Sequence, residues 1–401
     1  MTRILHRQIH TDMPVAAGGE GVYLIDTDGK RYLDASGGAA VSCLGHGDKD
    51  VIEAIKAQLD TMAFAHTGFF TSEPSETLAD LLIEAAPDGI GAVYFVSGGS
   101  EAIEAALKMA RQYFVEIGEL KRSKFIARHQ SYHGNTLGAL SVGGNVARRE
   151  PFKELLMDVA HIAPCYPYRD RRDDESEEEY GLRVANELET EIQRLGAENV
   201  CAFVAETVGG ATAGVLPPVT GYLKRIRDIC NAHGILLILD EVMCGMGRTG
   251  HTFACAEDGV VPDLIAVAKG LGAGYQPIGA TLVHERIFNA FKDGSGFFQH
   301  GHTYMGHPAA CAGALAVQTK IKENGLLSQV RERGEQLVEK LHERFGNHPH
   351  IGDIRGRGLF RAIEIVADRT TKEPFDPGLK IFAKIKANAM KEGLVCYPGG
   401  G

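Results

Sequence analysis

The chain has 401 residues, 44% hydrophobic and 23% charged, which suits a globular enzyme with a core large enough for two or three domains. Its 42 basic and 52 acidic residues give a formal net charge of −10, which argues against a general nucleic-acid-binding protein. No apolar run reaches the length of about 18 residues that a membrane span requires, and the N-terminus lacks the apolar stretch of a signal peptide. Eight scattered cysteines without a C-x-x-C pair predict reduced thiols in a cytoplasmic protein.

The first two thirds of the chain predict an α/β fold. Residues 21–38 alternate like an antiparallel hairpin with its turn at Asp28-Gly29. From about residue 46 to 305, short apolar runs alternate with helical patterns, which is typical of a mostly parallel sheet covered by helices. The expected strands are 92–96, 124–128, 200–205, 235–239, 264–268 and 278–283, and the expected helices are 50–61, 75–86, 100–117, 180–195 and 219–233.

The pattern changes after residue 306. Helical stretches at 308–323, 326–345 and 378–392 and a strand-like patch at 359–366 predict a smaller α+β domain. We therefore expect a large domain over 46–305 and a small domain over 306–401, to which the N-terminal segment 1–45 also belongs.

Four chemical features follow expected strands of the large domain. Ser97-Gly98-Gly99-Ser100 joins a strand to a helix, where exposed N–H groups and the helix dipole can bind a phosphate. Without a Walker sequence, an ordinary strand-to-helix turn remains an alternative. Tyr132 or His133 can stack on a flat ligand, although packing on the sheet explains a loop aromatic equally well.

The other two features are an acid pair and a lysine. Asp240 and Glu241 end a buried strand and, as successive residues, point to opposite faces of it. Lys269 ends another buried strand, where partial desolvation lowers the pKa of its ammonium group and favours attack on carbonyl groups. The alternative is a lysine that pairs with an acid and has no catalytic role. In open α/β sheets ligands bind at these strand ends, so the set predicts pyridoxal 5′-phosphate. No histidine or cysteine spacing predicts a metal site.

Longer motifs extend these features along nearly the whole chain. They include "DGKRYLD", "LGHG", "FFTSEPSETLADLL", "SGGSEAIEAALKMAR", "YHGNT", "LDEVMCGMGRTG", "AKGLGAGYQPIGA", "HGHTYMGHPAA" and "RGRGLF". In this order they resemble the class III aminotransferases of fold type I, of the ω-amino acid–pyruvate kind. The resemblance implies a homodimer with active sites at the subunit interface, acting on small-molecule amines and oxo acids.

The resemblance also implies a role for each matching residue. Lys269 forms the Schiff base with the cofactor, and Asp240 pairs with its pyridine nitrogen. The remaining cofactor contacts are Val242 and Tyr132 on the two ring faces, Glu206 near the polar edge of the ring, Gly99 and Ser100 at the phosphate, and Thr303 reaching the phosphate from the partner subunit.

Several departures from the family pattern concern the substrate. Relatives that use ornithine, acetylornithine or GABA commonly carry E-P-x-Q-x-E, whereas Gly209 and Ala211 stand here at the positions of the Gln and the second Glu. Ala40 takes the place of a frequent tryptophan, which predicts a roomier pocket, and Phe69 or Phe70 is expected to line it. The family usually continues for a few dozen residues beyond this end, with an arginine that binds the substrate carboxylate.

The predicted reaction is a ping-pong transfer of an amino group from an amine or ω-amino acid to an oxo acid, with pyruvate expected. An aminomutase or a decarboxylase on the same fold is an alternative. So is a nicotinamide dehydrogenase that uses Gly245, Gly247 and Gly250, although these glycines do not clearly open a helix.

Overall fold

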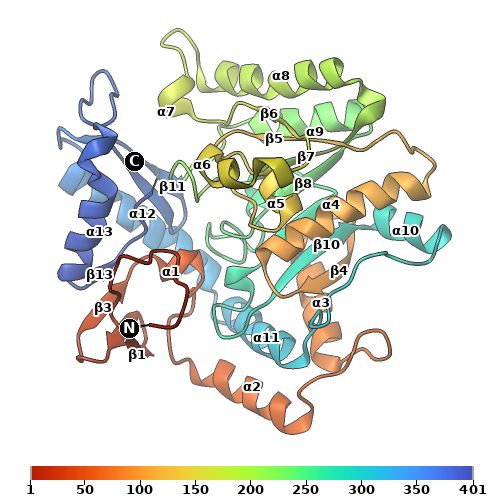
Figure 1. Ribbon diagram of the computed structural model, residues 1–401, viewed down its shortest axis with the longest axis horizontal. Coiled ribbons are helices and arrows are strands. Elements are labelled where there is room, and N and C mark those ends of the chain that lie inside the picture. Colours follow the sequence, from red (N-terminus) through yellow and green to blue (C-terminus); the bar gives the residue numbers. More distant parts are fainter. Residues whose placement is uncertain (1, 400–401) are drawn as a thin grey trace.

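The computed structural model describes residues 2–399 and is built around a seven-stranded sheet (Figure 1). The strand order is β4-β10-β9-β8-β7-β5-β6. Strands β5 to β9 run parallel to one another, and β10 is antiparallel to both β4 and β9. The strands are β4 (Ile90–Val96), β5 (Lys124–Arg128), β6 (Ala160–Ile162), β7 (Val200–Glu206), β8 (Leu236–Asp240), β9 (Leu264–Val267) and β10 (Gly279–His284).

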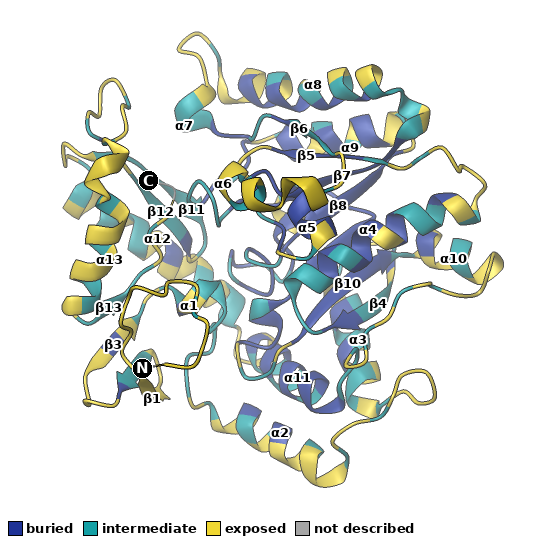
Figure 2. Cartoon of the chain, viewed as in Figure 1, coloured by how far each residue is buried: buried dark blue, intermediate teal, exposed yellow. Residues whose placement is uncertain are grey.

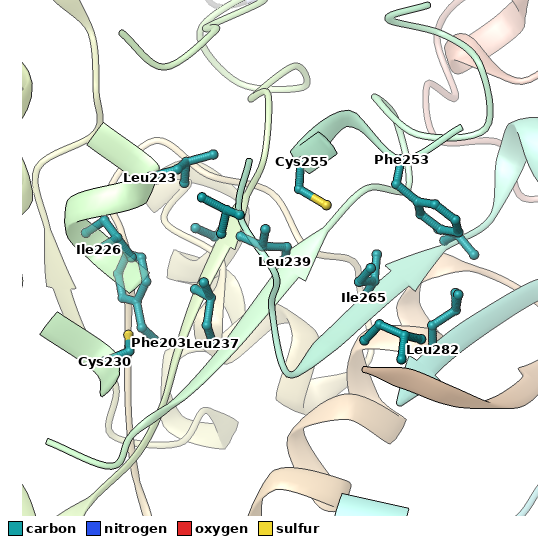
Figure 3. Packing of buried hydrophobic residues seen from close by; sticks show 14 of the residues in the cluster. Phe203, Leu223, Ile226, Cys230, Leu237, Leu239, Phe253, Cys255, Ile265 and Leu282 are labelled. Atoms are coloured by element: carbon teal, nitrogen blue, oxygen red, sulfur yellow. The ribbon is translucent and has the colours of Figure 1, made fainter. Parts of the chain in front are cut away.

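Helices cover both faces of this sheet, because its central strands are apolar on both faces. On β8, Leu237 and Leu239 belong to one core cluster, and Leu236 and Ile238 belong to the other. The first cluster includes residues of α3 (Glu73–Ala85), α8 (Glu177–Leu195), α9 (Tyr222–Ala232) and α11 (Pro308–Glu323). The second includes residues of α4 (Gly99–Glu116), α5 (Leu137–Val142) and α10 (Glu285–Asp293). Figure 2 shows the sheet as the buried centre of the molecule, and Figure 3 shows the first cluster around Leu237 and Leu239.

Two smaller sheets lie beside the large one. Strands β1 (Ala16–Glu20), β2 (Tyr23–Asp26) and β3 (Arg31–Asp34) form a meander, and β13 (Leu394–Val395) joins it parallel to β3. Strands β11 (Ile351–Arg357) and β12 (Phe360–Ile365) form a hairpin. Helices α12 (Leu326–Phe345) and α13 (Ile381–Lys391) accompany these sheets, and α2 (Lys49–Thr61) packs against α11. The N-terminal strands and the end of the chain therefore share one sheet, as Figure 1 shows.

The strands and helices expected from the sequence are confirmed to within a few residues, including the hairpin with its turn at Asp28-Gly29. Strands β1, β6, β11 and β13 were not predicted from the sequence. Strand β6 has three residues and β13 has two, while β11 reads IGDIRGR and lacks an apolar alternation. Within residues 2–399, no helix is both long and apolar enough to cross a membrane.

Candidate active site

A cavity of about 440 Å³ lies where β7, β8 and β9 end. Parallel strands place their carboxyl ends at one edge of a sheet, so residues far apart in sequence meet there. Seven residues with an expected cofactor role line this one cavity: Gly99, Ser100, Tyr132, Glu206, Asp240, Val242 and Lys269.

Lys269 follows β9 with an unusual backbone. Its φ angle is 47°, in the left-handed region that side chains other than glycine rarely adopt. Burial lowers the pKa of the Lys269 ammonium, although the negative charges of Asp240 and Glu206 act in the opposite direction. Desolvation therefore favours the neutral amine, which is the nucleophilic form.

Asp240 is the last residue of β8, and its side chain faces the cavity. It is 4% exposed. One carboxylate oxygen accepts the N–H of Val242 at 2.9 Å, and the other lies 2.8 Å from Nδ1 of His133. His133 is 3% exposed, and its Nε2 is buried without a hydrogen-bond partner. The sequence suggested His133 only as a stacking residue. Its contact with Asp240, 107 positions away along the chain, cannot be predicted from the residues near either one.

Glu241 points to the opposite side of the strand and is fully buried. It accepts hydrogen bonds from the hydroxyl of Thr207 at 2.9 Å and from the N–H groups of Ala254 and Cys255 at 2.6 and 2.7 Å. Burial raises the pKa of this carboxyl group, and the three donors oppose that rise. Glu241 therefore anchors the turn at 254–258, and the cavity contains Asp240 but not Glu241.

Glu206 ends β7 beside Asp240 and is 5% exposed. Its carboxylate accepts the N–H of Gly210 at 3.2 Å and that of Tyr132 at 3.4 Å. Burial and the negative charge of Asp240 raise the pKa of the Glu206 carboxyl, and its electrostatic interactions with His133 and Arg128 lower it. Arg128 itself donates to the main-chain oxygen of Glu206 at 2.6 Å, which holds the ends of β5 and β7 together.

The first turn of α4 has the features of an anion site. Its N-cap is Gly98, and no side chain caps the helix, so its first N–H groups are open to a ligand. A methyl group added at Gly99 would lie 2.8 Å from a Val242 methyl carbon. The hydroxyl of Ser100 accepts the N–H of Asn135 at 3.1 Å, which joins the loop after Tyr132 to the same turn.

Four predicted residues do not line this cavity in the single chain. Ala40 has a φ angle of 63°, and its neighbour Val41 lines the cavity instead. Phe69 and Phe70 line a second hollow of about 380 Å³ together with Gly306. Thr303 is exposed. The predicted roles of these four residues stay predictions.

The segment that contains Gly245, Gly247 and Gly250 forms a run of turns after β8. Gly247 and Gly250 both have a φ angle of 92°. A dinucleotide site of this type requires glycines at the start of a helix, so the segment lacks the context that the dehydrogenase alternative needs.

Comparison with known proteins identifies the family. The family model for class-III aminotransferases matches residues 6–401. The chain is a class-III aminotransferase. It is 47% identical to an uncharacterized aminotransferase of Schizosaccharomyces pombe over 389 residues, which is 97% of this chain and 85% of that protein.

Solved aminotransferase structures share its fold. The crystal structure of the omega transaminase from Pseudomonas jessenii in complex with PMP matches with a TM-score of 0.94 at 34% identity, covering 98% of this chain and 89% of that one. An amine transaminase from an uncultivated Pseudomonas species, in its PLP-bound form, matches with a TM-score of 0.94 at 36% identity, covering 100% and 93%. The fold is that of the fold-type I transaminases, and the cofactor is pyridoxal 5′-phosphate.

The cavity residues of this aminotransferase fit that cofactor. The uncapped turn of α4 suits its phosphate, the buried Asp240 suits a protonated ring nitrogen, and the partly desolvated Lys269 suits its carbonyl carbon.

Proposed function

We propose that this aminotransferase moves an amino group from an amine or ω-amino acid to an oxo acid, with pyruvate as the acceptor, and that Lys269 forms the Schiff base with the cofactor. The observation that carries the proposal is the placement of Lys269: a lysine with a lowered pKa follows a buried strand and lines the same cavity as Asp240. Neither feature is needed for a lysine with only a structural role.

Each cavity residue has a proposed task. Gly99 and Ser100 bind the phosphate with their N–H groups, and Asp240 keeps a proton on the ring nitrogen. Val242 and Tyr132 flank the ring, and Glu206 lies at its polar edge. Pyridoxal phosphate, when bound, supplies a carbonyl carbon that condenses with amines and a ring that withdraws electrons from the substrate. The neutral amine of Lys269 would take up the proton that the substrate carbon releases.

The donor class rests on two lines of support. Gly209 and Ala211 replace the residues expected in relatives that use diamino acids or GABA. Solved structures of similar chains include omega transaminases and an amine transaminase. We propose that Ala40 and either Phe69 or Phe70 border the donor.

We further propose a cytoplasmic homodimer in which Thr303 completes the phosphate site of the partner subunit. Phe69, Phe70 and Tyr304 are 82%, 68% and 63% exposed. The Phe64 and Tyr304 rings lie 5.7 Å apart, so the segments around residues 64–70 and 303–306 form one surface. A continuous aromatic surface of this kind is typical of a subunit interface.

The Lys269→Ala variant tests the central assignment. We expect a folded protein that binds pyridoxal phosphate without the covalent link, so that borohydride no longer fixes cofactor to the chain, and that loses amino transfer to pyruvate. Lys108→Ala, on the exposed side of α4, is the control and should keep both properties. Amino transfer near the wild-type rate in Lys269→Ala would contradict the assignment.

A further inference from the structure

Part of the cavity wall lies outside the proposed cofactor contacts and is apolar. It includes Val41, Val208, Met243 and Ile278. Val208 comes two residues after Glu206, and Met243 comes three residues after Asp240. A donor whose amine reaches Lys269 therefore lies near this apolar wall. The width of the cavity beside the wall limits the size of the donor's side chain.

Phe360 lies behind Val208 and Met243. It is the first residue of β12, is 7% exposed, and belongs to the core cluster that contains Val208, with Met243 packed against that cluster. A methyl group added at Gly210 would lie 2.4 Å from Cζ of Phe360 and 3.2 Å from Sδ of Met243. The Phe360 ring, the Met243 thioether and the Gly210 backbone therefore meet at one point.

Hydrogen bonds hold the hairpin that carries Phe360 against this wall. Arg355 on β11 donates to the main-chain oxygens of Val215 at 2.6 Å and Ala213 at 2.8 Å, both in the segment that follows β7. The N–H of Leu359 donates to the main-chain oxygen of Arg248, in the segment that follows β8, at 3.2 Å. The hairpin that carries Phe360 is thus bonded to both segments that contribute the wall.

We propose that Phe360 is a positioning residue that determines donor specificity: by filling the space behind Met243 and Val208, it sets the width of the substrate end of the cavity. The inference rests on the proposed function and deepens it, because it names the structural limit on donor size. Phe360 does not line the cavity, so it acts only through Met243 and Val208. A smaller residue at 360 lets this wall move back, and a methyl group at Gly210 pushes it inward.

The test uses two alkoxyamines, O-methylhydroxylamine and O-benzylhydroxylamine, which react with enzyme-bound pyridoxal phosphate whatever the natural donor is. Each reaction is followed by the absorbance of the cofactor. The measured quantity is the second-order rate constant for O-benzylhydroxylamine divided by that for O-methylhydroxylamine. We expect this ratio to rise about tenfold in Phe360→Ala and by a smaller factor in Phe360→Leu. Phe360→Leu keeps the test valid if the alanine variant does not fold.

Gly210→Ala tests the same wall in the opposite direction. Gly210 has no left-handed backbone, so alanine adds only the methyl group that meets Phe360. We expect the ratio to fall about tenfold, and to return towards the wild-type value in the double variant Gly210→Ala/Phe360→Leu. Phe114→Leu is the matched control, since Phe114 is 1% exposed and lies on α4, in a different core cluster from Phe360.

A ratio within twofold of wild type in both Phe360 variants would overturn the proposal, as would an equal change in Phe114→Leu. The same conclusion follows if Phe360→Leu does not relieve the effect of Gly210→Ala. Because the alkoxyamines need only the bound cofactor, a wild-type enzyme that reacts with them but transfers no amino group contradicts the proposed function separately.

Discussion

Asp240 and Glu241 are adjacent acids with different environments. Asp240 faces the cavity and contacts His133, whereas Glu241 is enclosed by three hydrogen-bond donors on the other side of the strand. The alternation of side chains along a strand accounts for this division. Only Asp240 is therefore placed to act on a ligand, and Glu241 is placed to hold the turn that follows.

The variants Asp240→Asn and Glu241→Gln separate these two roles. A neutral amide cannot hold a proton on the ring nitrogen, so we expect Asp240→Asn to lower kcat by about 10³, equivalent to about 4 kcal/mol. Glu241→Gln should instead lower the melting temperature and keep kcat within about tenfold, because the amide cannot accept all three hydrogen bonds and does not line the cavity. Single-turnover rates and thermal unfolding measure both effects. An Asp240→Asn rate within tenfold of wild type would mean that another acid holds the proton on the ring nitrogen.

At the scale of elements, β6 shows how a three-residue edge strand is held. His161 at its centre stacks on His129 at 5.5 Å between ring centroids, and its Nε2 lies 3.1 Å from the main-chain oxygen of Gly143. Burial lowers the pKa of His161 to about 4, and the charges of Arg149 and His129 act in the same direction. The neutral imidazole is thus the form that joins β6 to α5.

Protonation of His161 should contribute to acid destabilisation. Above pH 6.5 the imidazole is neutral in both the folded and the unfolded chain, and its pKa shift has no effect. As the pH falls from about 6.5 to about 4, mainly the unfolded chain takes up the proton, so stability falls by about 3 kcal/mol. We expect His161→Phe to lose less unfolding free energy than wild type over this interval in urea titrations. The exposed control His10→Phe should follow the wild-type curve, and identical curves for all three proteins would contradict the prediction.

At the scale of the molecule, the cavity and the exposed aromatic surface are separate within one chain. The cavity lies at the strand ends, while Phe69 and Phe70 line the second hollow with Gly306. In the proposed homodimer, Thr303 crosses to the other subunit, so association and cofactor binding depend on each other.

Two variants distinguish association from phosphate binding. Phe69→Asp places a charge in the proposed interface, so sedimentation velocity should show monomers that lose pyridoxal phosphate on gel filtration. Thr303→Ala should remain dimeric but bind the cofactor about tenfold more weakly, because one hydrogen bond to the phosphate is lost. Phe382→Asp, on exposed α13, is the control and should change neither property. A stable monomer that retains the cofactor would refute the shared site.

The sequence by itself determined six of the seven strands of the large sheet and the residues at their ends, because apolar runs, small residues and helix patterns are local signals. That is why Lys269, Asp240 and Gly99 were predicted and are found around one cavity. Only the tertiary structure decided which residues support them. His133 contacts Asp240 across 107 positions, and Phe360 packs behind Met243 from a hairpin that the apolar pattern only half revealed. Such contacts depend on how the chain folds back on itself, so they cannot be predicted from side-chain type and spacing within one segment.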